Sequence, residues 1–299
     1  MANDISLTAG MRNNLLSLQN TNNLITQTQQ RLSSGKKVNS ALDNPTNFFA
    51  AQANQNRATD LTNRKDGMGE AIQMVKAADA GITAITSLIQ SAQGIASSAL
   101  ATTSVTDRAN FAATFNTLMS QVSQLASDSG YRGTNFLNAQ NQTVEFAPTT
   151  NGATLQIQGF NATSAGLSVG TAAIAAGNGQ TAVTSTSVGG TNSTSTQWND
   201  STTSSASAAI SSSSAQLEGA LTALRSQSSA LSANLSVVTT RQSFTDSMVN
   251  VLNTGSDNLT LADMNEEGAN MLMLQTRQNL GTSSLSMASQ AAQSVLRLF

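Results

Sequence analysis

Apolar side chains near the start of the chain recur at alternating steps of four and three residues. This spacing predicts the a/d seam of a coiled-coil helix. Ser33, Ser34 and Gly35 are expected to end the helix, because glycine readily takes the left-handed conformation found after helix ends. The apolar members of the seam are Leu7, Met11, Leu15, Leu18, Ile25 and Leu32, and Asn22 and Gln29 interrupt it as polar members.

Two further helices are predicted in the N-terminal half. The pair Asn44-Pro45 indicates a helix start, since an asparagine side chain caps a helix and proline fits its first position. The apolar stripe that follows breaks near residues 102–104, and a third helix is expected to end before Gly130. The two stripes contain Met68, Ile72, Val75, Ile82, Ile89 and Ala96, and then Phe111, Phe115, Leu118, Val122 and Leu125.

The C-terminal part returns to helical spacing from about residue 206. One seam predicts a helix over 210–252, which includes Ile210, Leu217, Leu221, Leu224, Leu231, Leu235, Val238, Val249 and Leu252. A last helix is expected after Gly255. Its seam contains Leu261, Met264, Gly268, Met271, Leu285, Ala292, Leu296 and Phe299, with Gln275, Gln278, Thr282 and Ser289 as polar members.

The middle of the chain has a different composition. Residues 146–199 carry no charged side chain and are rich in Ser, Thr, Gly and Asn. Alternation in Thr143–Phe146 and Thr154–Gln158 predicts two short strands. Residues 177–205 resemble a linker. Because large apolar groups are few in 160–199, that stretch is expected to bury little surface and to contribute little to folding.

These elements predict a mainly α fold, in which long antiparallel helices from both chain ends form a coiled-coil rod and the central region is small and rich in β-hairpins. The expected domains are 1–44 plus 256–299 as a terminal coiled coil, 45–142 plus 206–255 as a helical rod, and 143–205 as an outer strand- and loop-rich region. A helix with an interrupted seam is marginal alone in water. The first and last helices are therefore expected to pair, but periodicity alone leaves open whether the coiled coil is intramolecular or part of a self-assembly.

Composition narrows the possible functions. The net charge is −2 with only 10% charged residues, so no basic face for nucleic acid is expected. The absence of cysteine and histidine excludes zinc fingers, thiol nucleophiles and histidine bases, whereas a carboxylate or lysine site stays open. Aromatic residues make up 4%, which suits thin helical rods better than a thick core. No cofactor or metal site, cleaved signal peptide or membrane-inserted segment is expected.

Three separated motif groups resemble the bacterial flagellins. Near the N-terminus they are Gln30-Arg31-Leu32-Ser33-Ser34-Gly35, Val38-Asn39-Ser40-Ala41 and Asp43; Gly133-Thr134-Asn135-Phe136-Leu137-Asn138 follows. At the C-terminus they are Ala262-Asp263-Met264-Asn265-Glu266-Glu267, Leu274-Gln275-Thr276-Arg277-Gln278-Asn279-Leu280-Gly281 and Ser294-Val295-Leu296-Arg297-Leu298-Phe299. The resemblance covers roughly 1–145 and 205–299, in the family's order, while the middle is shorter than in many members.

The resemblance implies a structural protein rather than an enzyme. The subunit would polymerise, by itself or together with other flagellins, into the extracellular filament used for swimming. It would be exported unfolded through the flagellar secretion apparatus, without a cleaved signal peptide. A filament cap, junction proteins and an export chaperone would be its other partners.

The chain ends are the predicted subunit interface. Its residues are Leu7, Met11, Leu15, Leu18, Ile25, Leu32, Leu261, Met264, Met271, Leu285, Val295, Leu296 and Phe299. Arg31 and Asp43 are candidates for ion pairs across the terminal bundle, and Glu266 and Glu267 suit the positive end of the last helix. O-linked sugars, which are common on flagellins, are expected at Thr184, Ser185, Thr186, Ser187, Ser193, Thr194 and Ser195.

Two other functions compete with the filament subunit. A hook–filament junction protein shares the terminal coiled coils, but the match at the C-terminal tail favours the filament subunit. A secreted effector-translocation protein would need a long apolar hairpin, which is missing. The metallopeptidase insert of some flagellins needs two histidines, and this chain has none.

Overall fold

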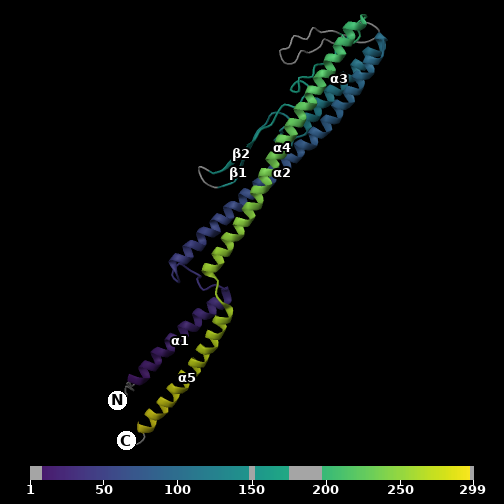
Figure 1. Cartoon of the computed structure of the whole chain (residues 1–299). Helices are drawn as coiled ribbons and strands as arrows, with labels where there is room; N and C mark the ends of the chain where they lie inside the picture. Colours follow the sequence, from purple (N-terminus) through teal and green to yellow (C-terminus); the bar gives the residue numbers. More distant parts are fainter. Residues whose placement is uncertain (1–8, 148–151, 175–196, 297–299) are drawn as a thin grey trace. The chain divides into compact units, whose positions relative to one another are not determined.

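The computed structural model describes residues 9–147, 152–174 and 197–296. The elements are α1 (Ala9–Ser34), α2 (Pro45–Ala101), α3 (Val105–Asp128), β1 (Gln142–Glu145), β2 (Thr154–Ile157), α4 (Thr203–Thr260) and α5 (Met264–Leu296) (Figure 1). The chain divides into two compact units, Met1–Thr59 with Met248–Phe299, and Asp60–Ser247. The mainly α fold with a small two-stranded sheet is as predicted, whereas the three-part division into domains stays a prediction.

Local chemistry sets the helix ends where the sequence indicates them. The Asn47 backbone N–H donates to Asn44 Oδ1 at 3.0 Å, so Asn44 caps α2 just before Pro45. At the other end of the connection, Gly35 has a φ of 69° and its N–H donates to the Arg31 carbonyl at 2.8 Å. Glycine thus closes α1 in the left-handed conformation, as predicted.

The larger unit holds the main apolar core. The predicted stripe of α2 is buried at Met68, Val75, Ile82, Ile89 and Ala96, and only Ile72 is partly exposed. It packs with α3 and α4 through Phe115, Val122, Ile210, Leu217, Leu224, Leu231 and Val238, which are all buried. The 3/4 spacing of the sequence therefore describes how these three helices bury their surface.

The hairpin lies against this core. β1 and β2 pair antiparallel, with Gln142 opposite Ile157 and Glu145 opposite Thr154. Ile157 is fully buried in the apolar cluster. On the other face, Arg64 of α2 forms an ion pair with Glu145. The two predicted strands are confirmed to within a residue at each end.

The expectation that residues 160–199 bury little is wrong for the described part of that stretch. Trp198 is 1% exposed, and its ring centroid lies 4.9 Å from that of Phe115. The Trp198 backbone N–H donates to the Ala173 carbonyl at 3.0 Å. The buried apolar residues of the stretch are Ala162, Leu167, Val169, Ala172, Ala173, Ile174 and Trp198. The composition of the stretch did not indicate this burial, because a few apolar groups among small residues suffice to fill the space beside α3.

Gly255 does not end a helix, contrary to the prediction. α4 continues through it to Thr260, and the chain leaves the helix only at residues 261–263. A glycine inside a helix costs only about 1 kcal/mol relative to alanine, which packing offsets. Here Ser256 Oγ donates to the Ala51 carbonyl of α2 at 3.3 Å, and a Cβ on Gly255 would lie 3.4 Å from Asn54 Nδ2.

Replacing the buried tryptophan tests the revised role of the middle segment. We expect Trp198→Ala to lower the free energy of unfolding by ~3–5 kcal/mol, because it leaves a cavity against Phe115. Chemical denaturation followed by circular dichroism measures this without tryptophan fluorescence. Trp198→Phe, which keeps most of the ring volume, should lose clearly less. A loss below about 1 kcal/mol for the alanine variant would contradict burial of this segment in the core.

Candidate functional site

The candidate site is the pair of helices formed by the chain ends, α1 and α5. Figure 1 shows them side by side and running in opposite directions within the smaller unit. Arg31 Nη1 lies 2.9 Å from Glu267 Oε1, and Gln278 Nε2 donates to Asn22 Oδ1 at 2.8 Å. Residues nearer the N-terminus of α1 thus lie beside residues nearer the C-terminus of α5. This is the antiparallel pairing predicted for the first and last helices.

The two helices approach closely at Gly281. A Cβ built there would lie 2.6 Å from Leu18 Cδ2, well inside normal contact. Asn14 Nδ2 also reaches the Gly281 carbonyl at 3.5 Å. A small residue at this position therefore sets the spacing of the helices, since any larger side chain has to displace Leu18.

The faces that meet are poor in buried apolar surface. In α1, only Thr21 and Thr28 are buried, at 8% and 6% exposure. Among the described side chains of α5, only Glu267 and Leu274 are buried. Most of the half-buried or buried positions follow 3/4 spacing: Met11, Asn14, Leu18, Thr21, Ile25, Thr28 and Leu32 in α1, and Glu267, Met271, Leu274, Gln278, Gly281, Leu285 and Ala288 in α5. Arg31, Gly268, Asn270 and Ser289 are half-buried beside these positions.

The predicted seams were therefore half right within the subunit. Met11, Leu18, Ile25 and Leu32 face the partner helix, and so do Met271, Gln278 and Leu285. The alternate members Leu15, Asn22, Gln29, Gln275 and Thr282 are exposed in the single subunit, and Asn14, Thr21, Thr28, Leu274 and Gly281 take the buried or half-buried positions, although Asn22 still accepts the hydrogen bond from Gln278. Their place in a contact between subunits stays a prediction. Leu261 and Met264 are each 47% exposed. Leu7 and Phe299 lie outside the described residues, and the side chains of Ala292, Val295 and Leu296 do too.

A second apolar face remains on the outside of the pair. Leu272 and Leu280 of α5 are 67% and 66% exposed. At about 100° per residue, Leu280 and its neighbours Met273 and Met287 point away from the face that meets α1. In α1, Leu16 and Leu24 are exposed as well. We call Leu272, Met273, Leu280 and Met287 the outward face of α5.

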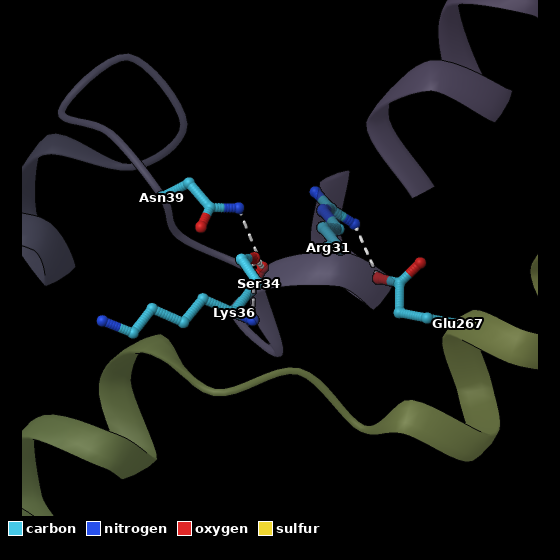
Figure 2. Close-up of polar contacts among 5 residues, drawn as sticks. All are labelled: Arg31, Ser34, Lys36, Asn39 and Glu267. Carbon is cyan, nitrogen blue, oxygen red and sulfur yellow. Dashed lines mark hydrogen bonds and ion pairs between the residues drawn. The ribbon is translucent and has the colours of Figure 1, made fainter. Parts of the chain in front are cut away.

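Backbone hydrogen bonds join the two segments at which the helices meet the rest of the smaller unit. The Ala262 N–H donates to the Gly35 carbonyl at 2.9 Å. The Lys37 and Val38 N–H groups both donate to the Thr260 carbonyl, at 2.7 and 3.3 Å. These bonds fix where α5 begins relative to the end of α1. Figure 2 shows this crossing, with the Arg31–Glu267 pair beside it.

Asp43 braces the loop after α1 rather than pairing across the bundle. Its Oδ2 accepts the N–H groups of Asn39 at 2.9 Å and Ser40 at 3.0 Å. These two backbone bonds lower the pKa of the Asp43 carboxyl below its usual value. Asn39 Nδ2 donates in turn to the Lys36 carbonyl at 3.1 Å (Figure 2). The loop is thus held by its own polar side chains.

Glu266 and Glu267 lie in the first turn of α5, at the positive end of the helix as predicted, but neither of them caps it. Asp263 caps the helix, since its Oδ1 accepts the N–H groups of Asn265 at 2.8 Å and Glu266 at 3.3 Å. Glu266 is exposed. Glu267 is buried and pairs with Arg31, which confirms an ion pair across the terminal bundle for Arg31.

Other chemistry is sparse in the part of the chain that the structure describes. It contains no group of three or more acidic, histidine or cysteine side chains that could hold a metal ion. One window of α2, with a mean hydropathy of 1.2, is long and apolar enough to cross a membrane by length and composition. A core helix of a folded domain meets the same criterion, and the apolar stripe of α2 is packed in the core.

Comparison with known proteins assigns the two halves of the chain. The family model described as the bacterial flagellin N-terminal helical region matches residues 5–142, and that of the C-terminal helical region matches residues 202–299. The chain belongs to the bacterial flagellin family. This flagellin is a structural subunit of the flagellar filament, an extracellular appendage, and it polymerises with itself. The family is one of structural proteins rather than enzymes.

Individual relatives match this flagellin over part or nearly all of its length. Flagellin FljM of Caulobacter vibrioides is 27% identical over 298 residues, which cover 99% of this chain and 98% of the relative. Flagellin C of Rhizobium meliloti is 41% identical over 69 residues, 22% of each chain. The flagellin of Listeria innocua is 27% identical over 165 residues, 53% of this chain and 57% of the relative.

Gly281→Val tests whether close approach holds the pair together. The added carbons would force α1 and α5 apart. We expect the free energy of assembly to become less favourable by ~1–3 kcal/mol, which raises the critical concentration for seeded polymerisation roughly five- to 150-fold. Gly268→Val is the matched control, because a Cβ at Gly268 meets nothing within 4 Å. Equal effects of the two substitutions would mean that contact with Leu18 does not matter.

Proposed function

We propose that this flagellin joins its neighbours in the filament through the outward face of α5 and the exposed leucines of α1. The observation that carries the proposal is the exposure of Leu272 and Leu280, at 67% and 66%, on a helix whose opposite side already has a partner. A helix on the surface of a monomer normally presents polar residues outward. Several large apolar groups along one exposed side instead mark a contact surface.

The energetics of a polymer support this use of the face. Burial of apolar surface contributes about 25 cal/mol per Å², so two to three buried leucine-sized side chains per contact stabilise it by several kcal/mol. The same contact recurs for each added subunit, because a head-to-tail interface that does not close into a ring generates an open helical filament. Weak pairing inside one subunit is then completed by its neighbours.

Other parts of the assembly pathway belong to the proposal as well. The subunit is exported as an unfolded chain through the flagellar secretion apparatus without a cleaved signal peptide, and an export chaperone keeps its ends apart until then. It adds at the filament tip beneath a cap, and junction proteins connect the first subunits to the hook. The predicted O-glycosylation sites, Thr184–Ser187 and Ser193–Ser195, lie outside the described residues and stay a prediction, as do the lack of nucleic-acid binding and of membrane insertion.

A charge on the outward face should block assembly. We expect Leu280→Asp to raise the critical concentration for seeded polymerisation at least about a hundredfold, because the carboxylate would be buried without a partner. Gln275→Glu is the matched control: it adds one negative charge at an exposed position of α5, on the flank between the outward face and the side that meets α1. Electron microscopy and sedimentation measure the outcome. Normal filaments from Leu280→Asp would remove the outward face of α5 from the interface.

The free subunit should show two levels of stability. Because α1 and α5 bury little against each other, their amides should exchange with solvent at least about a hundredfold faster than those of α2 between Met68 and Ala99. Assembly should slow them strongly, as expected for folding coupled to binding. Hydrogen exchange of monomer and filament, read by mass spectrometry, measures this. Strong protection of both end helices in the monomer would contradict the proposal that neighbouring subunits stabilise them.

A further inference from the structure

α5 has two apolar sides, and the side turned to α1 is not the richer one. Toward α1 it presents the large apolar residues Met271, Leu274 and Leu285. Away from α1 it presents four, the outward face Leu272, Met273, Leu280 and Met287. A rotation of α5 about its own axis by less than half a turn would exchange the two sides. Apolar burial alone therefore does not explain why α1 and α5 meet as they do.

One contact distinguishes the two arrangements sharply. Glu267 is 7% exposed, and its Oε1 receives Arg31 Nη1 at 2.9 Å. Glu267 Oε2 is buried and has no hydrogen-bond partner among the described residues. The ion pair is thus the partner that this buried carboxylate has, and a rotation of α5 that turns Glu267 away from Arg31 would break it.

The positions of Arg31 and Glu267 in their helices strengthen the effect of their ion pair on the arrangement of α1 and α5. Arg31 lies in the last turn of α1 and Glu267 in the first turn of α5, where each charge has the sign that the helix dipole favours. Both residues are next to the crossing at which the Gly35 and Thr260 carbonyls accept backbone N–H groups. The backbone bonds fix how far the helices are displaced along each other. They leave the rotation of α5 about its axis to its side chains.

We infer that Arg31 and Glu267 are positioning residues for assembly: their ion pair selects which side of α5 turns to α1, and so keeps Leu272, Leu280 and Met287 free for a neighbouring copy of the chain. The inference rests on the proposed function, because it assumes that the outward face is the one used in the filament. A buried ion pair has this kind of role where it specifies an arrangement more than it stabilises one.

Disulfide trapping in the monomer can measure the selection. The chain has no cysteine, so introduced pairs report without background. Leu18→Cys with Gly281→Cys reports the observed side, since these positions are in contact. Leu18→Cys with Leu280→Cys reports the rotated side. With Arg31 and Glu267 present, we expect the first pair to close at least about tenfold faster than the second, which corresponds to ~1.4 kcal/mol of preference.

The ratio of the two rates, read together with helix content, separates selection from simple loss of structure. Arg31→Met and Glu267→Gln should each bring the ratio close to one while the far-ultraviolet circular dichroism of the monomer stays unchanged. Fraying of the helices would also bring the ratio towards one, but it would lower the helical signal. Glu266→Gln is the matched control, because it removes a carboxylate from the same turn that is exposed and has no ion pair with Arg31. It should keep the parent ratio.

Two results would overturn the inference. One is a parent ratio that persists in both Arg31→Met and Glu267→Gln, and the other is an equal drop in Glu266→Gln. Failure of the proposed function looks different, because Leu280→Asp would then form normal filaments while the trapping ratio still depended on Arg31 and Glu267.

Discussion

The structure of this flagellin depends on how little its chain ends bury against each other. Across the described part of the α1–α5 pair, Leu274 is the one large apolar side chain that is fully buried, and its companions are two threonines and a glutamate. The larger unit instead buries Met68, Ile85, Phe115 and Trp198 in a continuous cluster. Because apolar burial is the main favourable term in folding, the two units differ in the stability that their own contacts contribute. The larger unit has an apolar core of its own, whereas the end helices bury little within the subunit.

Polar contacts take over where apolar burial is scarce. The crossing near Gly35 and Thr260 is held by backbone hydrogen bonds, and the loop behind it is held by the Asp43 carboxylate. Such bonds contribute only about 1 kcal/mol each, but they are directional. They fix a geometry without adding much stability. This combination suits a subunit whose ends have to be correctly placed in the filament and still gain most of their stability there.

The sequence predicts elements well where the signal is local. The end of α1, the start and end of α2 and the start of α3 follow from Gly35, Asn44-Pro45 and the polar break near residue 102, because capping depends on a few neighbouring residues. Gly255 misled the prediction, since its cost as a helical residue is offset by contacts with α2 that sequence spacing does not reveal. The burial of Trp198 was missed for the same reason. Its partner Phe115 is far away in the chain, and no periodicity connects the two.

The alternate positions of the two seams were missed for a physical reason that also bears on function. Choosing the most apolar path along α1 selects Leu15 over Asn14, yet Asn14 is the one that reaches Gly281. A helix with apolar groups on two sides has two plausible seams, and hydrophobic spacing cannot choose between them. The choice depends on contacts between residues more than 200 positions apart, such as Arg31 with Glu267. A basic residue in the last turn of one helix and an acidic one in the first turn of its partner is the signal in the sequence that could have found it. A polymer subunit that buried its most apolar sides internally would be a better monomer and a poorer building block, so the weaker internal seam is the one compatible with assembly.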